Sequence, residues 1–229
     1  DRDPVLDKLR PSSEYIHQRI KSAASTKTVD GASVFWILDH EVTRLMPDGT
    51  TKRVVTIVRT PLDRAGRDRL GEMKLPRKGL LKVLDAYVID KKGRRQEVTS
   101  LHGRKVRFPK VEEGAVVVIQ YRHIQRPSGY LKEHLASNWT FQHSLGQVQE
   151  ATWILAIPPQ RKLNISLQGK IDHSKSEEHG LTIHRFVARD VEPLRPEPNS
   201  PPAADLLRTA VVSTVPSWDY FSAWGRSLT

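Results

Sequence analysis

Apolar and polar residues alternate with a period of two along most of the chain between Val34 and Asp190. Successive side chains of a strand point to opposite faces, so this pattern is typical of strands with one buried face. The segment 51–60 (TKRVVTIVRT) is rich in β-branched residues, which suit a pleated surface. A turn signal at 47–49 (Pro-Asp-Gly) separates it from 34–45 (VFWILDHEVTRL), so the two segments predict a β-hairpin.

The same arrangement recurs along the chain. A second hairpin is predicted at 80–101, around a charged turn that contains Gly93, and a buried strand at 115–124 follows the turn ending at Gly114. Further strands are predicted at 147–158 and in a last hairpin, whose arms flank a polar turn at 172–179. About nine or ten strands with no helix between them indicate antiparallel pairing, and hence an all-β fold, an antiparallel β-sandwich.

Helical periodicity is confined to the two ends of the chain. Residues 12–25 predict a short N-terminal helix, with Ile16 and Ile20 on one face. At the other end, Ser217 is a good N-cap for a helix start. Four bulky apolar residues follow at spacings of three, three and four, and we expect them to pack at a domain junction: Trp218, Phe221, Trp224 and Leu228.

A stretch with five prolines, 193–202, separates this helix start from most of the preceding chain. We therefore predict four segments. Residues 1–30 form an N-terminal helix and linker, and 31–192 form the β-sandwich domain. Residues 193–204 are a Pro-rich linker, and 205–229 are a helical junction to a C-terminal domain that this chain lacks.

The composition is that of an ordinary soluble globular protein, with 38% hydrophobic and 28% charged residues. No apolar run approaches the roughly 18 to 20 residues of a membrane span. Cysteine is absent, which excludes disulfides, thiolate metal sites and a cysteine nucleophile within these residues. The absence of thiols also suits an oxidising compartment such as the bacterial periplasm.

The net charge of +11 is carried entirely by the first half of the chain, because residues 1–110 contain 25 Lys and Arg against 14 Asp and Glu. Solvated loops and hairpin tips explain such a pattern, and so does a surface for anionic partners. The segment 64–82 contains no aromatic residue for stacking on bases, so we expect no specific nucleic acid as a partner. The candidate anion-binding residues are Arg64, Arg67, Arg69, Lys74, Arg77 and Lys78.

Motifs that carry catalytic chemistry are missing from the sequence. None of the nine histidines lies in an HExxH motif, and the chain has no GxSxG motif and no glycine-rich phosphate loop. We therefore expect no catalytic residue, no cofactor and no metal site. Trp36, Trp139 and Trp153 lie in predicted strands, where they either line a binding groove or fill the core, and burial of aromatic rings favours the core.

Several segments, in this order, resemble a known family. They are the hairpin 39–60 around MPDGT, the strand 80–90 with its charged Gly turn, FPKVEEGAVVVIQYRH, FQHSLGQVQEATWILAIPP and VSTVPSWDYFSAWGRSL. The chain is similar over roughly 30–229 to the bacterial domain of unknown function 3857 family, a β-rich domain that precedes transglutaminase-like domains. One departure is Gly225, where the family usually carries an aromatic residue. The resemblance also favours a strand in the ambiguous segment 130–144.

The resemblance implies a noncatalytic accessory module of a bacterial envelope protein, with a protein-binding or substrate-presenting role. The implied partner is an adjoining transglutaminase-like domain, whose catalytic residues would lie beyond Thr229. Periplasmic or cell-envelope localisation is expected, with no transmembrane segment in these residues. Two alternatives stay open. One is an electrostatic module for anionic envelope surfaces, such as lipid headgroups or acidic polymers, and the other is an independent hydrolase built on converging acids or histidines.

Overall fold

The computed structural model describes residues 2–98, 101–128, 134–144, 146–195, 201–202, 205–217 and 226. The helices in this part of the chain are α1 (Pro4–Leu9), α2 (Ser13–Ala23) and α3 (Arg64–Leu70). The longer strands are β1 (Val34–Leu45), β2 (Thr51–Pro61), β4 (Leu80–Ile89), β8 (Val116–Gln125), β10 (Gly146–Ile157), β12 (Asp172–Glu178) and β13 (Leu181–Val191). The shorter ones are β3 (Glu72–Lys74), β5 (Arg95–Glu97), β6 (Leu101–His102), β7 (Lys105–Arg107), β9 (Ala136–Thr140), β11 (Asn164–Gln168) and β14 (Thr209–Ser213).

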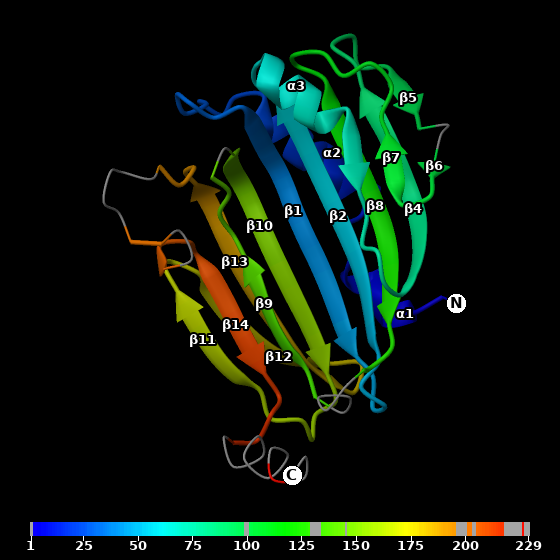
Figure 1. The fold of residues 1–229 in the computed structure, drawn as a ribbon, viewed down its shortest axis with the longest axis vertical. Helices are drawn as coiled ribbons and strands as arrows, with labels where there is room; N and C mark the ends of the chain where they lie inside the picture. The colour runs from blue at the N-terminus through cyan, green and yellow to red at the C-terminus, as the bar shows by residue number, and fades with distance from the viewer. Residues whose placement is uncertain are drawn as a thin grey trace.

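One eight-stranded sheet forms the centre of the molecule, in the order β12-β13-β10-β1-β2-β8-β4-β5 (Figure 1). The all-β fold class is therefore confirmed, with more and shorter strands than the nine or ten predicted. The sheet is also mixed, because β1 and β10 pair in parallel, from Val34 opposite Gly146 to Arg44 opposite Ala156. The purely antiparallel pairing was wrong at this point. About a hundred residues separate β1 from β10, so the connecting chain is long enough for either a parallel or an antiparallel arrangement. The local sequence pattern does not show which of the two forms.

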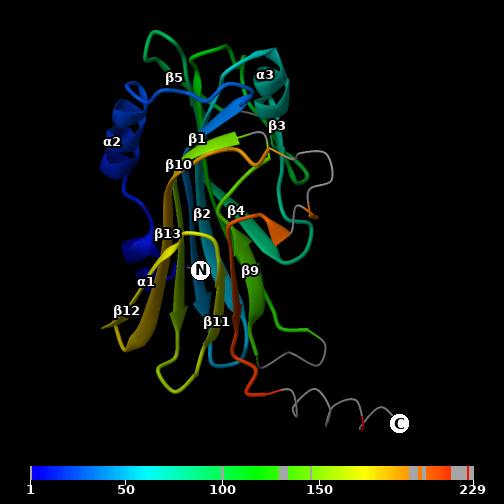
Figure 2. The same ribbon diagram turned by 90° about the vertical axis from the view of Figure 1, so that its left-hand side faces the viewer.

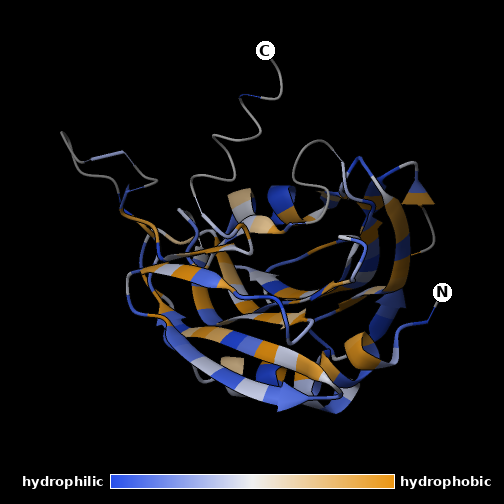
Figure 3. Cartoon of the chain, turned by 90° about the horizontal axis from the view of Figure 1, so that it is seen from below, coloured by the Kyte–Doolittle hydropathy of each residue, from blue (hydrophilic) through white to orange (hydrophobic). Residues whose placement is uncertain are grey.

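The molecule has three layers, which Figure 2 shows edge-on: α1 and α2 on one face of the large sheet, which we call the outer face, and two small sheets on the other, the inner face. The small sheets have the orders β11-β14-β9 and β3-β7-β6. Along the strands, hydrophobic and hydrophilic residues alternate (Figure 3). Apolar residues of the large sheet nevertheless pack on both faces, with Phe35 and Ile37 against α2 and with Trp153 and Phe186 in a cluster on the opposite face.

The inner face holds two separate apolar clusters. One lies under the β3-β7-β6 sheet and α3, where Ile119 and Val88 of the large sheet meet Val106 and Leu70. The other lies under the β11-β14-β9 sheet, where Trp153 and Phe186 meet Phe141 and Val212. Trp153 is fully buried and Trp139 packs beside it, as predicted for rings that fill the core. Trp36 is only partly buried and contacts both clusters.

The predicted hairpin at 34–60 is confirmed as β1 and β2, which pair antiparallel from Val34 opposite Pro61 to Leu45 opposite Thr51. Gly49 closes its turn with a φ of +83°, a conformation that glycine adopts at no steric cost. The hairpin predicted at 80–101 is confirmed for β4 and β5, with Tyr87 opposite Glu97, but its predicted end at Leu101 belongs to β6 of a small sheet.

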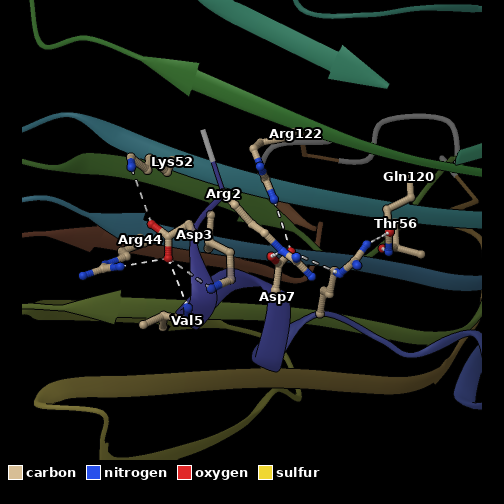
Figure 4. Close-up of polar contacts among 11 residues, drawn as sticks. Arg2, Asp3, Val5, Asp7, Arg44, Lys52, Thr56, Gln120 and Arg122 are labelled. Carbon is tan, nitrogen blue, oxygen red and sulfur yellow. Dashed lines mark hydrogen bonds and ion pairs between the residues drawn. The ribbon is translucent and has the colours of Figure 1, made fainter. Parts of the chain in front are cut away.

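Polar contacts attach α1 to the outer face (Figure 4). The carboxylate of Asp3 caps α1 and also lies 2.8 Å from the guanidinium of Arg44 on β1. Asp7 lies 3.2 Å from the guanidinium of Arg122 on β8. The sequence predicted the second helix, α2, but not α1, whose six residues are too few to show a helical period. Residues 4–23 thus pack on the sheet as part of the same folded unit.

Three further features differ from the sequence predictions. Helix α3 lies between β2 and β3, where no helix was expected, since its seven residues are mostly charged and carry no apolar stripe. Residues 172–178 form β12, paired with β13, rather than a turn. Residues 209–213 form β14, between β11 and β9, rather than part of a helical junction. No helix among the described residues is long and apolar enough to cross a membrane.

Candidate anion-binding site

The predicted domain-junction residues, Trp218, Phe221, Trp224 and Leu228, lie outside the described residues. Their packing role stays a prediction. The other predicted site, the basic surface, lies within the described part of the chain and leads to a pocket on the inner face.

The basic surface is built on α3 and the segment that follows it. Asp63 caps α3 by accepting a hydrogen bond of 2.7 Å from the backbone N–H of Gly66. Leu70 turns inward and is 1% exposed, which fixes the face that the helix presents. Three basic residues of the predicted set lie on α3 and one on β3, and two follow in the loop before β4: Arg64, Arg67, Arg69, Lys74, Arg77 and Lys78.

Most of this surface is free of ion pairs. Arg67 is half-buried, and its Nε lies 3.9 Å from a carboxylate oxygen of Glu113. The other five side chains are exposed and form no ion pair within the described part of the chain. Their charges are therefore available to an anionic partner, although solvation alone also accounts for them.

One of these residues, Arg69, also lines a pocket of about 320 Å³ near the start of β1. We call it the Trp36 pocket. The rest of its lining comes from β1, from the end of β2, from α3 and from the segment that leads into β10: Val34, Trp36, Arg59, Leu70, His143, Ser144 and Gly146.

The indole of Trp36 is held between neighbouring groups of this pocket. The imidazole of His143 stacks on it, with ring centroids 3.9 Å apart and planes 11° from parallel. The guanidinium carbon of Arg59 lies 4.7 Å from the centre of the indole, a cation–π geometry. Gly146 leaves room for the ring, because a Cβ at that position would come within 2.6 Å of it. Glycine at 146 is thus required by close packing.

His143 also contacts the carboxylate of Asp39. The Nε2 of His143 lies 3.3 Å from Oδ2 of Asp39, and Asp39 is 8% exposed. Burial lowers the pKa of Arg59 to about 10, and the negative charge of Asp39 acts in the opposite direction. Arg59 remains a cation at neutral pH, because this pKa is well above 7.

The guanidinium of Arg59 has few polar partners. Its Nε is buried and has no hydrogen-bond partner. Its Nη2 donates to the sulfur of Met73 at 3.7 Å, and a thioether is a weak acceptor. A buried guanidinium N–H without an acceptor is costly. Because this Nε is closed to solvent, a ligand in the pocket would meet the other N–H groups of Arg59.

A second polar pocket of about 410 Å³ lies on the outer face, beside the linker between α1 and α2. There Glu150 accepts a hydrogen bond of 2.6 Å from Tyr15 and pairs with Arg19 and Arg189. Burial, and then the bond to Glu150, raise the pKa of Tyr15 to about 12. These contacts hold α2 on the sheet, so the acidic group of this pocket is already neutralised.

The histidines do not converge on a metal site among the described residues, where no group of three or more His, Asp or Glu side chains could hold an ion. Two of them meet across β12 and β13, with Nε2 of His173 3.1 Å from Nδ1 of His184. Burial and the neighbouring His173 lower the pKa of His184 to about 4. The two rings meet because His173 lies on β12, which pairs with β13. The sequence predicts a turn, and no strand, at residues 172–179.

Sequence reasoning found Arg69 and named Trp36, but it missed Arg59 and His143 as members of a site. No sequence pattern gave Arg59 a role, and His143 lies in no recognised histidine motif. One signal for their contact was available, a glycine at the very start of a buried strand, which often marks a close approach of another group.

Comparisons with known proteins agree with this fold. Residues 98–195 match the family model described as a Domain of Unknown Function, DUF3857. Among curated proteins, none matches the sequence. The chain resembles the crystal structure of a candidate protease from Parabacteroides distasonis, with a TM-score of 0.72 and 17% identity. That similarity covers 82% of this chain and 41% of the other.

A weaker similarity is to an M1 zinc metallopeptidase from Deinococcus radiodurans, with a TM-score of 0.44 and 14% identity over 80% of this chain and 42% of that one. The chain thus spans about two fifths of the length of the solved structures that it resembles. At such identities the likeness concerns the fold alone. Residues 98–195 are thus similar to the DUF3857 family, the domain of unknown function that the sequence resembles.

Proposed function

We propose that this chain is a noncatalytic accessory module of a bacterial envelope protein, which packs beside a transglutaminase-like domain and binds or presents a substrate to it. The observation that carries the proposal is the extent of the similarity to the candidate protease from Parabacteroides distasonis. It covers 82% of this chain but only 41% of the other, so in that protein the same fold accompanies a larger remainder. A module of this kind contributes surfaces rather than chemistry, in line with the absence of catalytic motifs from the sequence.

The first test is the gene sequence downstream of the codon for Thr229. We expect it to continue into a domain with a cysteine nucleophile and a histidine further along, which form the reactive pair of a papain-like fold. A stop codon directly after Thr229 would contradict the proposal. So would hydrolytic activity of residues 1–229 alone that a single His or Glu substitution removes, since the chain would then be an independent hydrolase.

The second test concerns the junction in the longer protein. If the four apolar junction residues pack between the two domains, Trp218→Ala and Trp224→Ala should split one cooperative unfolding transition into two. The matched control is Ser222→Ala in the same segment, which should leave a single transition. Calorimetry measures both. Two separate transitions in the unmodified protein would show that the domains do not pack together.

An electrostatic role at anionic envelope surfaces is a second candidate, because five exposed cations on and after α3 have no ion pair in the described residues. Sedimentation with vesicles of phosphatidylglycerol should then retain the protein at 0.05 M NaCl and release it at 0.5 M, where the Debye length falls to about 4 Å. Vesicles of phosphatidylcholine are the neutral control. Binding that is unchanged at 0.5 M NaCl would contradict this mechanism.

A further inference from the structure

The Trp36 pocket has a cationic lining with no carboxylate in it. Two guanidinium groups, those of Arg59 and Arg69, line it together with an imidazole and a hydroxyl. The nearest acids are already engaged. Asp39 contacts His143 and its charge acts on Arg59, while Asp63 accepts hydrogen bonds from the backbone of Gly66 and the hydroxyl of Ser33 and lies near the charge of Arg69. The lining itself therefore offers cations and hydrogen-bond donors to a ligand, and no negative charge.

The two arginines have complementary positions. Arg59 is half-buried on β2, and its guanidinium carbon lies 4.7 Å from the centre of the Trp36 indole. Arg69 is exposed and comes from α3. Both residues line the pocket, so an anion bound there would accept charge-assisted hydrogen bonds from the two guanidinium groups.

Size and shape restrict the anion further. A volume of about 320 Å³ is at the small end of ligand pockets, so it holds one or two residues of a peptide and not a folded loop. Trp36, Val34 and Leu70 give it an apolar wall next to the guanidinium groups. A planar carboxylate matches the fork of a guanidinium, and the group that carries the carboxylate then contacts the apolar wall.

We propose that the Trp36 pocket binds the carboxylate of a small amphiphilic ligand, of which the C-terminal end of a short peptide is the simplest. The carboxylate accepts hydrogen bonds from Arg59 and Arg69, and the adjoining side chain packs on Trp36. This inference rests on the proposed binding role and names its ligand class, but it does not depend on the identity of any neighbouring domain.

The test uses three probes on the chain of 229 residues: N-acetyl-Ala-Ala with a free carboxylate, the same dipeptide as a C-terminal amide, and inorganic phosphate. Titration calorimetry should give an affinity for the acid about tenfold or more above that for the amide. Arg69→Gln should weaken binding of the acid about three- to tenfold, and Arg59→Gln should weaken it more. The matched control is Arg64→Gln, which removes the same charge from the same helix outside the pocket and should leave the affinity unchanged within about twofold.

A second readout locates the binding. In a proton–nitrogen spectrum, the indole N–H signal that is missing from Trp36→Phe should shift with the acid and not with the amide. Arg69 is exposed, so its variant tests the proposal even if Arg59→Gln does not fold. Equal affinity for acid and amide, equal or tighter binding of phosphate, or equal losses in Arg64→Gln and Arg69→Gln would each overturn the assignment. So would a lack of any binding at 10 mM acid.

These results are separable from the proposed accessory role. A downstream catalytic domain would still be found in the gene if the pocket bound nothing, and a pocket that binds carboxylates would remain if no such domain followed.

Discussion

The carboxylate of Asp3 has two structural roles at the start of α1. It accepts hydrogen bonds from the backbone N–H groups of Val5 and Leu6, and it pairs with Arg44 at 2.8 Å and Lys52 at 3.7 Å (Figure 4). Burial acts to raise its pKa, but the bond to Arg44, the bond to Leu6 and the nearby cations outweigh burial and lower the pKa below 3.8. The ionised form is thus favoured in the folded protein.

From this we predict the stability of Asp3→Asn. The amide can still cap the helix, but it leaves two cations without their buried counterion, so the free energy of unfolding should fall by about 2 kcal/mol near neutral pH. The exposed Asp68→Asn on α3 is the control and should change it by less than about 0.5 kcal/mol. Urea unfolding of the three proteins measures both values. A loss in Asp68→Asn as large as in Asp3→Asn would contradict a specific role for the pair.

The lowered pKa also predicts a pH dependence. A carboxyl whose pKa is depressed by folding contributes stability above its unfolded pKa, and this contribution is lost as the pH falls through the folded value. The difference in stability between the native protein and Asp3→Asn should therefore be constant from pH 7 to 5 and shrink below pH 4. A difference that grows on acidification would show that the pKa is raised instead.

Gly146 limits the geometry of the Trp36 pocket through its lack of a side chain. In Gly146→Ala the new methyl group would meet Trp36 at 2.6 Å, so the indole must move, and we expect a loss of stability of about 1–3 kcal/mol. Gly71→Ala is the matched control, because its Cβ would have contacts no closer than 3.7 Å. Thermal unfolding compares the two. Equal stabilities of Gly146→Ala and Gly71→Ala would mean that the Trp36 indole can move aside without a loss of packing.

At the scale of elements, β14 decides how the inner face is closed. Its five residues alternate, so that Ala210 and Val212 are buried against the large sheet while Val211 is 49% exposed. The strand lies between β11 and β9 and pairs with both. The alternating pattern of β14 is only five residues long and follows a Pro-rich stretch, so the sequence alone does not distinguish it from a linker. Pairing with β11 and β9 stabilises this segment as a strand.

This arrangement predicts different effects for two adjacent valines. Val212→Ala removes methyl groups from a filled core and should lower the free energy of unfolding by about 2 kcal/mol. Val211→Ala, on the opposite side of the same strand, should lower it by less than about 0.5 kcal/mol. Chemical denaturation measures both losses. A larger loss in Val211→Ala than in Val212→Ala would show that Val211, and not Val212, faces the core.

At the scale of the whole molecule, each face of the large sheet is covered by a different kind of layer. On the outer face, Ile16 of α2 packs with Phe35, Ile37 and Val118, which would otherwise be exposed. The inner face is covered by two small sheets with separate apolar clusters, and Trp36, which lines the pocket, contacts both clusters. Helices thus cover the outer face and small sheets cover the inner face, and each face retains a pocket.

The helical layer predicts the effect of a charge at Ile16. Ile16→Asp places a carboxylate in the apolar contact between α2 and the sheet, so α2 should detach and expose that face. Binding of a hydrophobic dye should rise and the unfolding midpoint should fall. Gln18→Asp, an exposed position on the same helix, is the control and should change neither. Unchanged dye binding in Ile16→Asp would show that the helices are not needed to cover the sheet.

Local sequence determined the features that depend on neighbouring residues. The hairpins β1–β2 and β4–β5 follow from alternation and from turns that contain Gly49 and Gly93, and the cap at Ser12 starts α2 where it was predicted. These are short-range effects of side-chain alternation, backbone freedom and capping, which a single segment contains in full.

Only the tertiary structure decided the parallel pairing of β1 with β10, the place of β14 and the composition of the Trp36 pocket. The pocket combines Trp36, Arg59, Arg69 and His143, which span more than one hundred positions of the chain. Their chemistry depends on which groups face each other after folding. The physical reason is that strand order and register are set by the packing of whole layers, because the chain buries both faces of the sheet at once, and no local pattern records that choice.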